Sequence, residues 1–156
     1  MKLLSQKMTN SHATEILNWR YPPPYSMYNQ EVSAAGLKEL LDQSYKAIVD
    51  QDGGLIGFYC TGRSAQVPKG HEFNVYQQTY IDIGLGMKPE LTGKGFGKEF
   101  LAFILQQLGS YSLRLTVAKF NQRAISLYEA FEFKHTHTFT NGGVEFITMI
   151  RKNIKA

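Results

Sequence analysis

Hydrophobic residues recur along the chain with two different spacings, and these spacings predict the secondary structure. Apolar residues three and four positions apart, such as Ala13, Ile16 and Leu17, predict helices. Short runs rich in β-branched and aromatic residues, bounded by glycine or proline, predict strands. The expected strands cover residues 3–8, 45–50, 55–61, 78–85, 113–117, 133–140 and 144–151. The expected helices cover residues 31–43, 98–108 and 121–131, preceded by a first helix that is capped by Asn10 or Ser11 and includes Trp19.

Turn signals between these segments indicate how the strands connect. Asp52-Gly53-Gly54 and Asn141-Gly142-Gly143 each separate two strands and predict hairpins. The polar stretch 62–75 is expected to be a loop. Strands 78–85 and 113–117 are joined by a helix and should therefore be parallel. We expect an α+β fold with a mixed, mainly antiparallel sheet of about seven strands, in a single domain over residues 1–156.

Composition narrows the class of protein. A length of 156 residues suits one domain with one substantial core. Cys60 is the only cysteine, so a disulfide framework is excluded and a reducing cytoplasm is compatible. No run of about 18 apolar residues occurs, so we expect no membrane span, and the N-terminus is too polar beyond Leu4 for a signal peptide. The net charge of +4 comes from scattered basic residues, which disfavours nucleic acid as a partner and suits a polyanionic ligand.

A glycine-rich stretch lies between strand 78–85 and helix 98–108. Gly93, Gly95 and Gly97 allow positive φ and let the backbone approach a ligand without a Cβ in the way. The first amides of the following helix have no intrahelical partners, so with the helix dipole they form a site for an anion such as a phosphate. The alternative is a flexible loop that binds nothing.

Two well-known phosphate loops do not match this stretch. A Walker A loop needs Ser or Thr directly after its lysine, whereas Glu99 follows Lys98. A Rossmann fingerprint needs glycines spaced G-x-G-x-x-G, whereas the glycines here are spaced G-x-G-x-G. Another kind of anion site is therefore indicated.

A second motif makes the signal specific. The chain reads P-x-x-x-G-K-G-x-G from Pro89, and then V-x-x-x-N-x-x-A-x-x-x-Y from Val117 to Tyr128 on the next strand and helix. Together these motifs resemble the GNAT superfamily of N-acetyltransferases over roughly residues 45–151. The resemblance implies a sheet with helices on both faces and acetyl-CoA as cosubstrate.

The resemblance also implies roles for particular residues. The backbone amides of Leu85 to Met87, where strand 78–85 should splay away from strand 113–117, would stabilise charge on the thioester carbonyl. Tyr128 would protonate the leaving thiolate, although it could be only a core aromatic residue. Asn121 would lie beside the cofactor, although a helix cap alone would explain it. The expected cofactor-binding residues are Leu85, Gly86, Met87, Gly93, Lys94, Gly95, Phe96, Gly97, Lys98 and Asn121.

Two positions depart from the family pattern. Thr92 stands where Gln or Arg is usual before the first glycine of the loop. This change is mild, because backbone amides mainly hold the pyrophosphate. Glu132 replaces the usual glycine before Phe133, which predicts a different exit from the second helix.

The sequence does not decide which residue accepts the proton of the substrate amine. Asp82 lies between Ile81 and Ile83 and is a candidate catalytic base, although simple outward alternation would also place it in solvent. Glu145 is a candidate for attracting the amine. Some family members carry a Glu just before the Val of the second motif, but Thr116 stands there in this chain.

The remaining candidates concern the acceptor and a metal. Three prolines impose an extended path on residues 21–29, whose Tyr25 and Tyr28 would line the acceptor site or merely cover the core. His135 and His137 lie two apart on a strand and should share a face, but a metal needs further ligands that the sequence does not supply. Cys60 is expected to be a small buried residue.

These observations predict an acetyl-CoA-dependent N-acetyltransferase that transfers the acetyl group directly to a primary amine of a small molecule or peptide. The expected partners are acetyl-CoA and that amine, with no metal, and the chain would act as a monomer or homodimer. The alternatives are a non-catalytic acyl-CoA-binding sensor or docking module, and a basic nucleic-acid-binding protein. Steep loss of DNA or RNA binding with salt would be required for the last of these.

Overall fold

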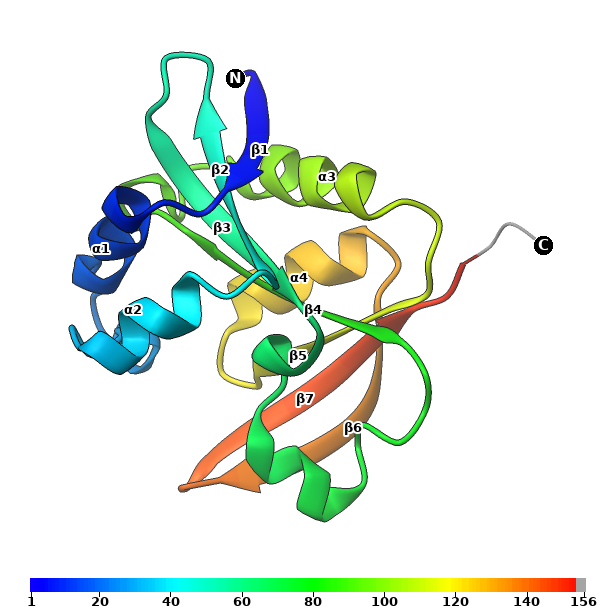
Figure 1. Ribbon diagram of the computed structural model, residues 1–156. Helices are drawn as coiled ribbons and strands as arrows, with labels where there is room; N and C mark the ends of the chain where they lie inside the picture. The colour runs from blue at the N-terminus through cyan, green and yellow to red at the C-terminus, as the bar shows by residue number, and fades with distance from the viewer. Residues whose placement is uncertain (154–156) are drawn as a thin grey trace. The chain divides into compact units, whose positions relative to one another are not determined.

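The computed structural model describes residues 1–153. Seven strands form a mixed sheet in the order β1-β2-β3-β4-β5-β7-β6 (Figure 1). The chain divides into two compact units: the first combines Met1–Cys60 with Leu85–Gln107, and the second combines Thr61–Gly84 with the chain from Leu108 onward. Strand β4 (Ile81–Met87) gives residues to both units. The α+β class and the mixed sheet of seven strands are confirmed, and the single domain stays a prediction.

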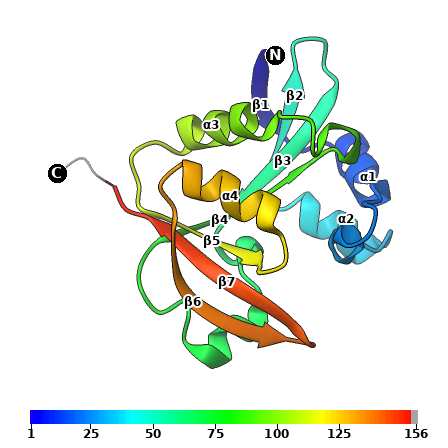
Figure 2. The same cartoon turned by 180° about the vertical axis from the view of Figure 1, so that it is seen from behind.

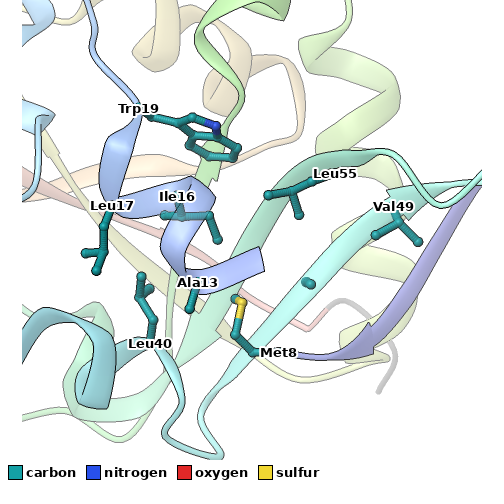
Figure 3. Packing of buried hydrophobic residues seen from close by; sticks show 9 residues of the cluster. Met8, Ala13, Ile16, Leu17, Trp19, Leu40, Val49 and Leu55 are labelled. Carbon is teal, nitrogen blue, oxygen red and sulfur yellow. The ribbon is translucent and has the colours of Figure 1, made fainter. Parts of the chain in front are cut away.

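The first unit has its core between helices and an antiparallel hairpin. Strands β2 (Tyr45–Asp50) and β3 (Leu55–Thr61) pair around the predicted turn, and β1 (Leu3–Lys7) pairs with β2. Helix α1 (Asn10–Asn18) contacts α2 (Ala34–Leu40), and α3 (Gly97–Leu108) has its predicted bounds within a residue. Figure 3 shows the core cluster, which is formed by residues of α1, α2, β2 and β3 and by the residues directly after β1 and α1: Met8, Ala13, Ile16, Leu17, Trp19, Leu40, Val49 and Leu55.

Helix ends in this unit are set by side chains that cap them. Thr9, rather than Asn10 or Ser11, caps α1, and its Oγ1 accepts the His12 amide at 3.1 Å. Ser33 caps α2 by accepting the Gly36 amide at 3.0 Å. The Asp42 carboxylate accepts the Ser44 amide at 2.9 Å, which forms a turn after the helix. The prediction of a helix over residues 31–43 was therefore too long at both ends.

The proline-rich segment also differs from its prediction. Residues 25–28 form a short 3-10 turn, η1 (Tyr25–Tyr28), instead of an extended path. The Tyr25 amide donates to the Pro22 carbonyl at 2.8 Å, and the Asn29 amide donates to the Ser26 carbonyl at 3.0 Å. Backbone hydrogen bonds thus turn the chain directly after the prolines.

The second unit combines one parallel pair of strands with a long hairpin (Figure 2). Strand β5 (Leu113–Ala118) is parallel to β4, as predicted, through Ile81 with Leu113 and Asp82 with Arg114. Strands β6 (Lys134–Asn141) and β7 (Val144–Arg151) form the predicted hairpin, and β7 also pairs with β5. Gly142 and Gly143 have φ of 57° and 82°, as a two-residue hairpin turn requires. Helix α4 (Gln122–Ala130) lies between β5 and β6 in the chain.

The prediction that His135 and His137 share a face was wrong. The register of β6 against β7 shifts between them, so that His135 lies opposite Met149 and His137 opposite Thr148. These partners are consecutive, and consecutive strand residues point to opposite faces. The extra residue is Thr136, a β-bulge that the alternation of the sequence does not reveal.

The expected loop 62–75 is packed rather than open. It contains two short 3-10 turns, η2 (Gly62–Ala65) and η3 (Pro68–Phe73). The ring of Phe73 lies 6.0 Å from that of Phe139 on β6. The loop therefore covers part of the second unit.

The unusual Glu132 keeps the helix exit that glycine normally provides. Its φ is 71°, in the left-handed region. The Phe133 amide donates to the Tyr128 carbonyl at 3.1 Å, and the Glu132 amide donates to the Glu129 carbonyl at 3.0 Å. These are the two bonds of a Schellman motif, and the accompanying apolar contact joins the rings of Tyr128 and Phe133 at 6.0 Å. The expectation of a different exit was thus wrong, because glutamate adopts the strained conformation.

Glu132→Gly is therefore expected to stabilise the protein. A residue with a Cβ loses about 1–2 kcal/mol in the left-handed conformation, and the greater freedom of glycine in the unfolded chain offsets part of the gain. We expect the free energy of unfolding to rise by about 1 kcal/mol and the melting temperature by about 2–4 °C. Glu129→Gly, three positions earlier inside α4, is the control and should lose about 1 kcal/mol. A lower melting temperature for Glu132→Gly would contradict this account.

Candidate functional site

The end of β4 is held in place from two sides within the first unit. A bulge in β3 leaves Ile56 without a partner on β2, and its carbonyl accepts the Lys88 amide at 2.8 Å. The Tyr21 hydroxyl donates to the Met87 carbonyl at 2.7 Å. Burial, and then the nearby Glu90 carboxylate, raise the pKa of Tyr21 to about 12, so the phenol keeps its proton at neutral pH. The end of β4, directly before the glycine-rich loop, is thus held by hydrogen bonds from its backbone to Ile56 and Tyr21.

Glycine is required where β3 and β4 approach each other. A Cβ at Gly86 would collide with the ring of Phe58. A Cβ at Gly57 would collide with the Gly86 carbonyl and the ring of Phe100. Gly86 lets Phe58 pack directly on the backbone of the segment whose amides are predicted to serve the thioester, and Gly57 leaves room for the Gly86 carbonyl and the ring of Phe100.

The glycine-rich loop adopts the predicted positive φ at Gly93 and Gly95 but not at Gly97. After the 3-10 turn η4 (Pro89–Leu91), Gly93 and Gly95 have φ of 72° and 85°, and α3 begins at Gly97. Gly93 and Gly95 are exposed, and a Cβ on Gly95 would meet no protein atom within 4 Å. The backbone therefore presents an open surface beside a helix N-terminus, which suits an anion.

Side chains around the loop modify its charge. Thr92 turns inward, and its hydroxyl donates to the Pro89 carbonyl at 2.7 Å. Lys94 and Lys98 are exposed, and Phe96 is half-buried. The first turn of α3 contains Glu99, which pairs with the N-terminal amine of Met1 at 2.8 Å. This pair neutralises the one carboxylate in the first turn of the helix, and an anion at the loop is repelled less as a result.

In the second unit, Asp82 is buried and paired with Arg114. Their relative exposures are 4% and 3%. Arg114 Nε and Nη2 donate to the two Asp82 oxygens, each at 2.7 Å, and Nη1 donates to the Gln78 carbonyl at 3.0 Å. The interpretation that Asp82 faces solvent was therefore wrong. Its role as catalytic base stays a prediction, but proton transfer to it would disturb a charge-assisted fork.

Aromatic residues and hydrogen bonds enclose this ion pair. The guanidinium of Arg114 lies 5.0 Å from the ring centre of Tyr76 and 5.5 Å from that of Tyr80. The Tyr76 hydroxyl is 2.7 Å from Thr116 Oγ1 and accepts the Val67 amide at 3.0 Å. Burial raises the pKa of Tyr76, so its hydroxyl keeps its proton at neutral pH. Thr116, which stands where the resemblance would allow a Glu, is thus a hydrogen-bond partner of Tyr76.

Sequence reasoning missed this network. Arg114 interrupts the apolar run Leu113-Arg114-Leu115, and Asp82 interrupts a similar run on the strand predicted to be parallel to it. Two opposite charges on neighbouring buried strands were a usable signal for an ion pair. Gln66 and Tyr76 come from the loop 62–80, where no periodicity marks them.

Tyr128 and Asn121 both lie in α4 or at its start. Tyr128 is 9% exposed and packs on Phe133, so its packing role is established and its acid role stays a prediction. The Asn121 side chain accepts the Ala124 amide at 3.2 Å and caps the helix, as predicted. Its contact with the cofactor stays a prediction.

The remaining candidate residues differ in how deeply they are buried. Tyr25 and Tyr28 are half-buried in η1 of the first unit. Glu145, at the start of β7, is exposed and lies 3.4 Å from Lys119 Nζ. Cys60 is buried, as predicted. Within residues 1–153, no three His, Cys, Asp or Glu side chains lie close enough to hold a metal ion, and no helix of that range is long and apolar enough to span a membrane.

Comparison with solved structures identifies the fold. A chimera of spermidine N-acetyltransferase SpeG from Vibrio cholerae and hSSAT has a TM-score of 0.71 at 19% identity, over 99% of this chain and 98% of that one. The structure of yncA, a putative acetyltransferase from Salmonella typhimurium with its cofactor acetyl-CoA, has a TM-score of 0.65 at 14% identity, over 100% and 96%. A putative GNAT-family acetyltransferase from Bordetella pertussis has a TM-score of 0.71 at 12% identity, over 96% and 95%.

Comparison of the sequence gives the family. No curated protein sequence matches the chain. The model of the acetyltransferase (GNAT) family matches residues 12–133, which is most of the chain and includes both motifs. Taken with the strand, glycine-rich loop and helix described above, this match means that the chain belongs to the GNAT family of acetyltransferases.

Proposed function

We propose that this acetyltransferase transfers the acetyl group of acetyl-CoA directly to a primary amine of a small molecule or peptide. The observation that carries the proposal is the loop between β4 and α3. Its glycines adopt positive φ at Gly93 and Gly95, expose the backbone and lead into a helix N-terminus. This geometry suits the pyrophosphate of coenzyme A, which needs amide donors at close range.

Acetyl transfer requires two functions besides pyrophosphate binding: stabilisation of negative charge on the thioester oxygen and protonation of the leaving thiolate. Negative charge develops on the thioester oxygen as the amine attacks, and amide donors at Leu85, Gly86 and Met87 would stabilise it. The fixed position of this segment, bonded by Tyr21 and Ile56, supports that role because preorganised donors need no rearrangement. The leaving thiolate would take a proton from Tyr128.

The acceptor is proposed to be an amine; Tyr25 and Tyr28 in the first unit are candidate contacts for it, and Glu145 in the second unit is a separate candidate for attracting it. Aromatic rings attract ammonium groups, and a carboxylate attracts them at longer range. A relative in structure is named for spermidine, so polyamines belong in the test panel. The net charge of +4 on this chain argues for acceptors of low positive charge, such as a monoamine or a peptide N-terminus.

A non-catalytic acyl-CoA-binding module is the second candidate. This candidate is favoured because neither carboxylate proposed to act on the amine, Asp82 or Glu145, is free of a charged partner. Asp82 is engaged by Arg114, and Glu145 is paired with Lys119. Such a module would bind acetyl-CoA and release no thiol.

Release of free thiol from acetyl-CoA separates the two candidates. The protein is incubated with acetyl-CoA and a panel of monoamines, polyamines, peptides and acidic acceptors, and thiol is measured with a chromogenic disulfide. Turnover with amines supports the proposal. Tight binding of acetyl-CoA without turnover of any acceptor would favour the binding module, and turnover of acidic acceptors alone would contradict an amine substrate.

Gly95→Val tests the loop. A branched side chain at this position would stand where the pyrophosphate approaches, so the Kd for coenzyme A should rise at least tenfold, or about 1.4 kcal/mol. Gly53→Val is a matched control, because Gly53 has a φ of 84° against 85° at Gly95 and is equally open. Both variants carry the same backbone strain, but only Gly95→Val should lose affinity by calorimetry. Equal affinities in the two folded variants would remove the loop from the cofactor site.

A further inference from the structure

Residues 20–30 of the first unit form a loop that is closed at its base. We call it the acceptor loop, because it carries two tyrosines that are candidate contacts for the amine. The Tyr21 amide donates to Asn29 Oδ1 at 2.6 Å, and Arg20 Nη1 donates to the Gln30 carbonyl at 3.1 Å. Each of these bonds joins the start of the loop to its end. The acceptor loop is therefore a closed piece of chain whose two ends separate only if both bonds break.

A hydrogen bond joins this loop to the segment whose amides are proposed to serve the thioester. The Tyr21 hydroxyl donates to the Met87 carbonyl at 2.7 Å, across 66 positions of the sequence. The amide of the same tyrosine forms one of the two bonds that close the loop. Tyr21 thus holds the base of the acceptor loop with its backbone and the end of segment 85–87 with its side chain.

The peptide group between Met87 and Lys88 is held on both sides. Its carbonyl accepts from Tyr21, and its N–H donates to the Ile56 carbonyl at 2.8 Å. Because a peptide group is planar, these two bonds together fix its orientation. The group follows directly after the Met87 amide, which is one of the proposed donors to the thioester oxygen. The acceptor loop is thus attached to segment 85–87 at a point that is itself fixed.

The surroundings of Tyr21 keep its hydroxyl a donor. The ring packs against the core cluster of the first unit. Burial, and then the Glu90 carboxylate, raise the pKa of Tyr21 to about 12, so the phenol stays protonated at neutral pH. The carbonyl of Met87 can only accept, and the phenol supplies the proton that the bond requires. Replacement by phenylalanine would keep the ring and remove the bond to Met87.

We propose that the Tyr21 hydroxyl is a positioning group for acetyl transfer, which holds the acceptor loop at a fixed place relative to segment 85–87. The inference rests on the proposed amine acetyltransferase function. Transfer requires the amine nitrogen to lie about 3–3.5 Å from the thioester carbon. The loop would bind the amine and the segment would bind the thioester, so a bond between the two limits this distance. Tyr21 would act through these two elements rather than on either reactant.

The first experiment compares Tyr21→Phe with Tyr45→Phe. Tyr45 is a matched control, because its ring packs on the same core cluster but its hydroxyl donates to the Glu39 carboxylate, at 3.5 Å. Tyr21→Phe should lower kcat for an amine from the panel by at least about tenfold, because a small misplacement of the reactants is costly. The KM for the amine and the Kd for acetyl-CoA should stay within about twofold, since the contacts that bind each reactant are retained. Tyr45→Phe should leave all three quantities unchanged.

The outcomes of this comparison separate positioning from stability. Loss of a neutral hydrogen bond should lower the melting temperature of either variant by only about 2–4 °C, so both stay folded in the assay. A fall in kcat of less than about tenfold for Tyr21→Phe would overturn the proposal. An equal fall in Tyr45→Phe, or an equal rise in the Kd for acetyl-CoA, would also overturn it.

The second experiment opens the base of the acceptor loop without changing the bond to Met87. Asn29→Leu removes the acceptor of the Tyr21 amide, so the KM for the amine should rise at least about fivefold. Asn29→Asp keeps an acceptor oxygen and should stay within about twofold of wild type. A KM for Asn29→Leu equal to that of the wild type would overturn the proposal, because the loop would then not position the amine. This pair of variants also decides the question if Tyr21→Phe does not fold.

Failure of the inference is distinguishable from failure of the proposed function. A wild type that acetylates no amine refutes the proposed function, and this inference with it. An active wild type with an equally active Tyr21→Phe refutes only the inference.

Discussion

Arg114→Met is expected to lower the free energy of unfolding by about 3–5 kcal/mol, because it leaves the buried carboxylate of Asp82 without its charged partner. The guanidinium forms a fork with both oxygens of Asp82 at 2.7 Å, and the two side chains are 4% and 5% exposed. The variant also loses the bond to the Gln78 carbonyl and the contacts with Tyr76 and Tyr80. Urea unfolding at neutral pH measures the loss.

Two comparisons make this prediction specific. The double variant Asp82→Leu with Arg114→Met removes both charges and should be much closer to wild type than either single change, since apolar residues can replace a buried pair at little cost. Lys119→Met breaks the exposed pair with Glu145, whose side chains are 57% and 53% exposed, and should cost less than about 1 kcal/mol. A loss below 1 kcal/mol for Arg114→Met, similar to that of Lys119→Met, would show that the buried pair contributes little.

The fold was largely predictable because its signals are local. Glycine turns at residues 52–54 and 141–143 marked the two hairpins, and the helix between strands marked the parallel pair. The errors arose where another residue competed for a hydrogen bond. Thr9 and Ser33 took the caps that begin α1 and α2, and the bulge at Thr136 reversed the face of one histidine. The spacing of apolar residues does not show which polar side chain will form a given hydrogen bond, so it could not predict these differences.

The candidate site was predictable to the extent that it consists of backbone. The loop from Pro89 to Gly97 would bind a ligand through amides of consecutive residues, so its glycines appear together in the sequence. Tyr21 and Gln66 instead act through contacts with residues that lie 66 and 16 positions away in the sequence. Such contacts depend on tertiary structure, and residues that lie in irregular segments carry no periodic signal for them.

Tyr128→Phe is expected to lower kcat by about 10²–10⁴-fold, the usual contribution of a positioned general acid. The change removes the hydroxyl that would protonate the leaving thiolate. It keeps the ring on Phe133, with centroids 6.0 Å apart, and the backbone bond from Phe133 to the Tyr128 carbonyl that ends α4. We therefore expect the Kd for acetyl-CoA and the melting temperature to change little. Steady-state rates with an amine from the panel, calorimetry and thermal unfolding measure the three quantities.

The matched control for this prediction is Tyr111→Phe, the same substitution at a tyrosine that is 64% exposed in the same unit. Its kcat should equal that of the wild type, which separates loss of a specific proton donor from a general effect of the substitution. If kcat of Tyr128→Phe stays within twofold of wild type, Tyr128 is a packing residue, and the thiolate leaves unaided or with a proton from water.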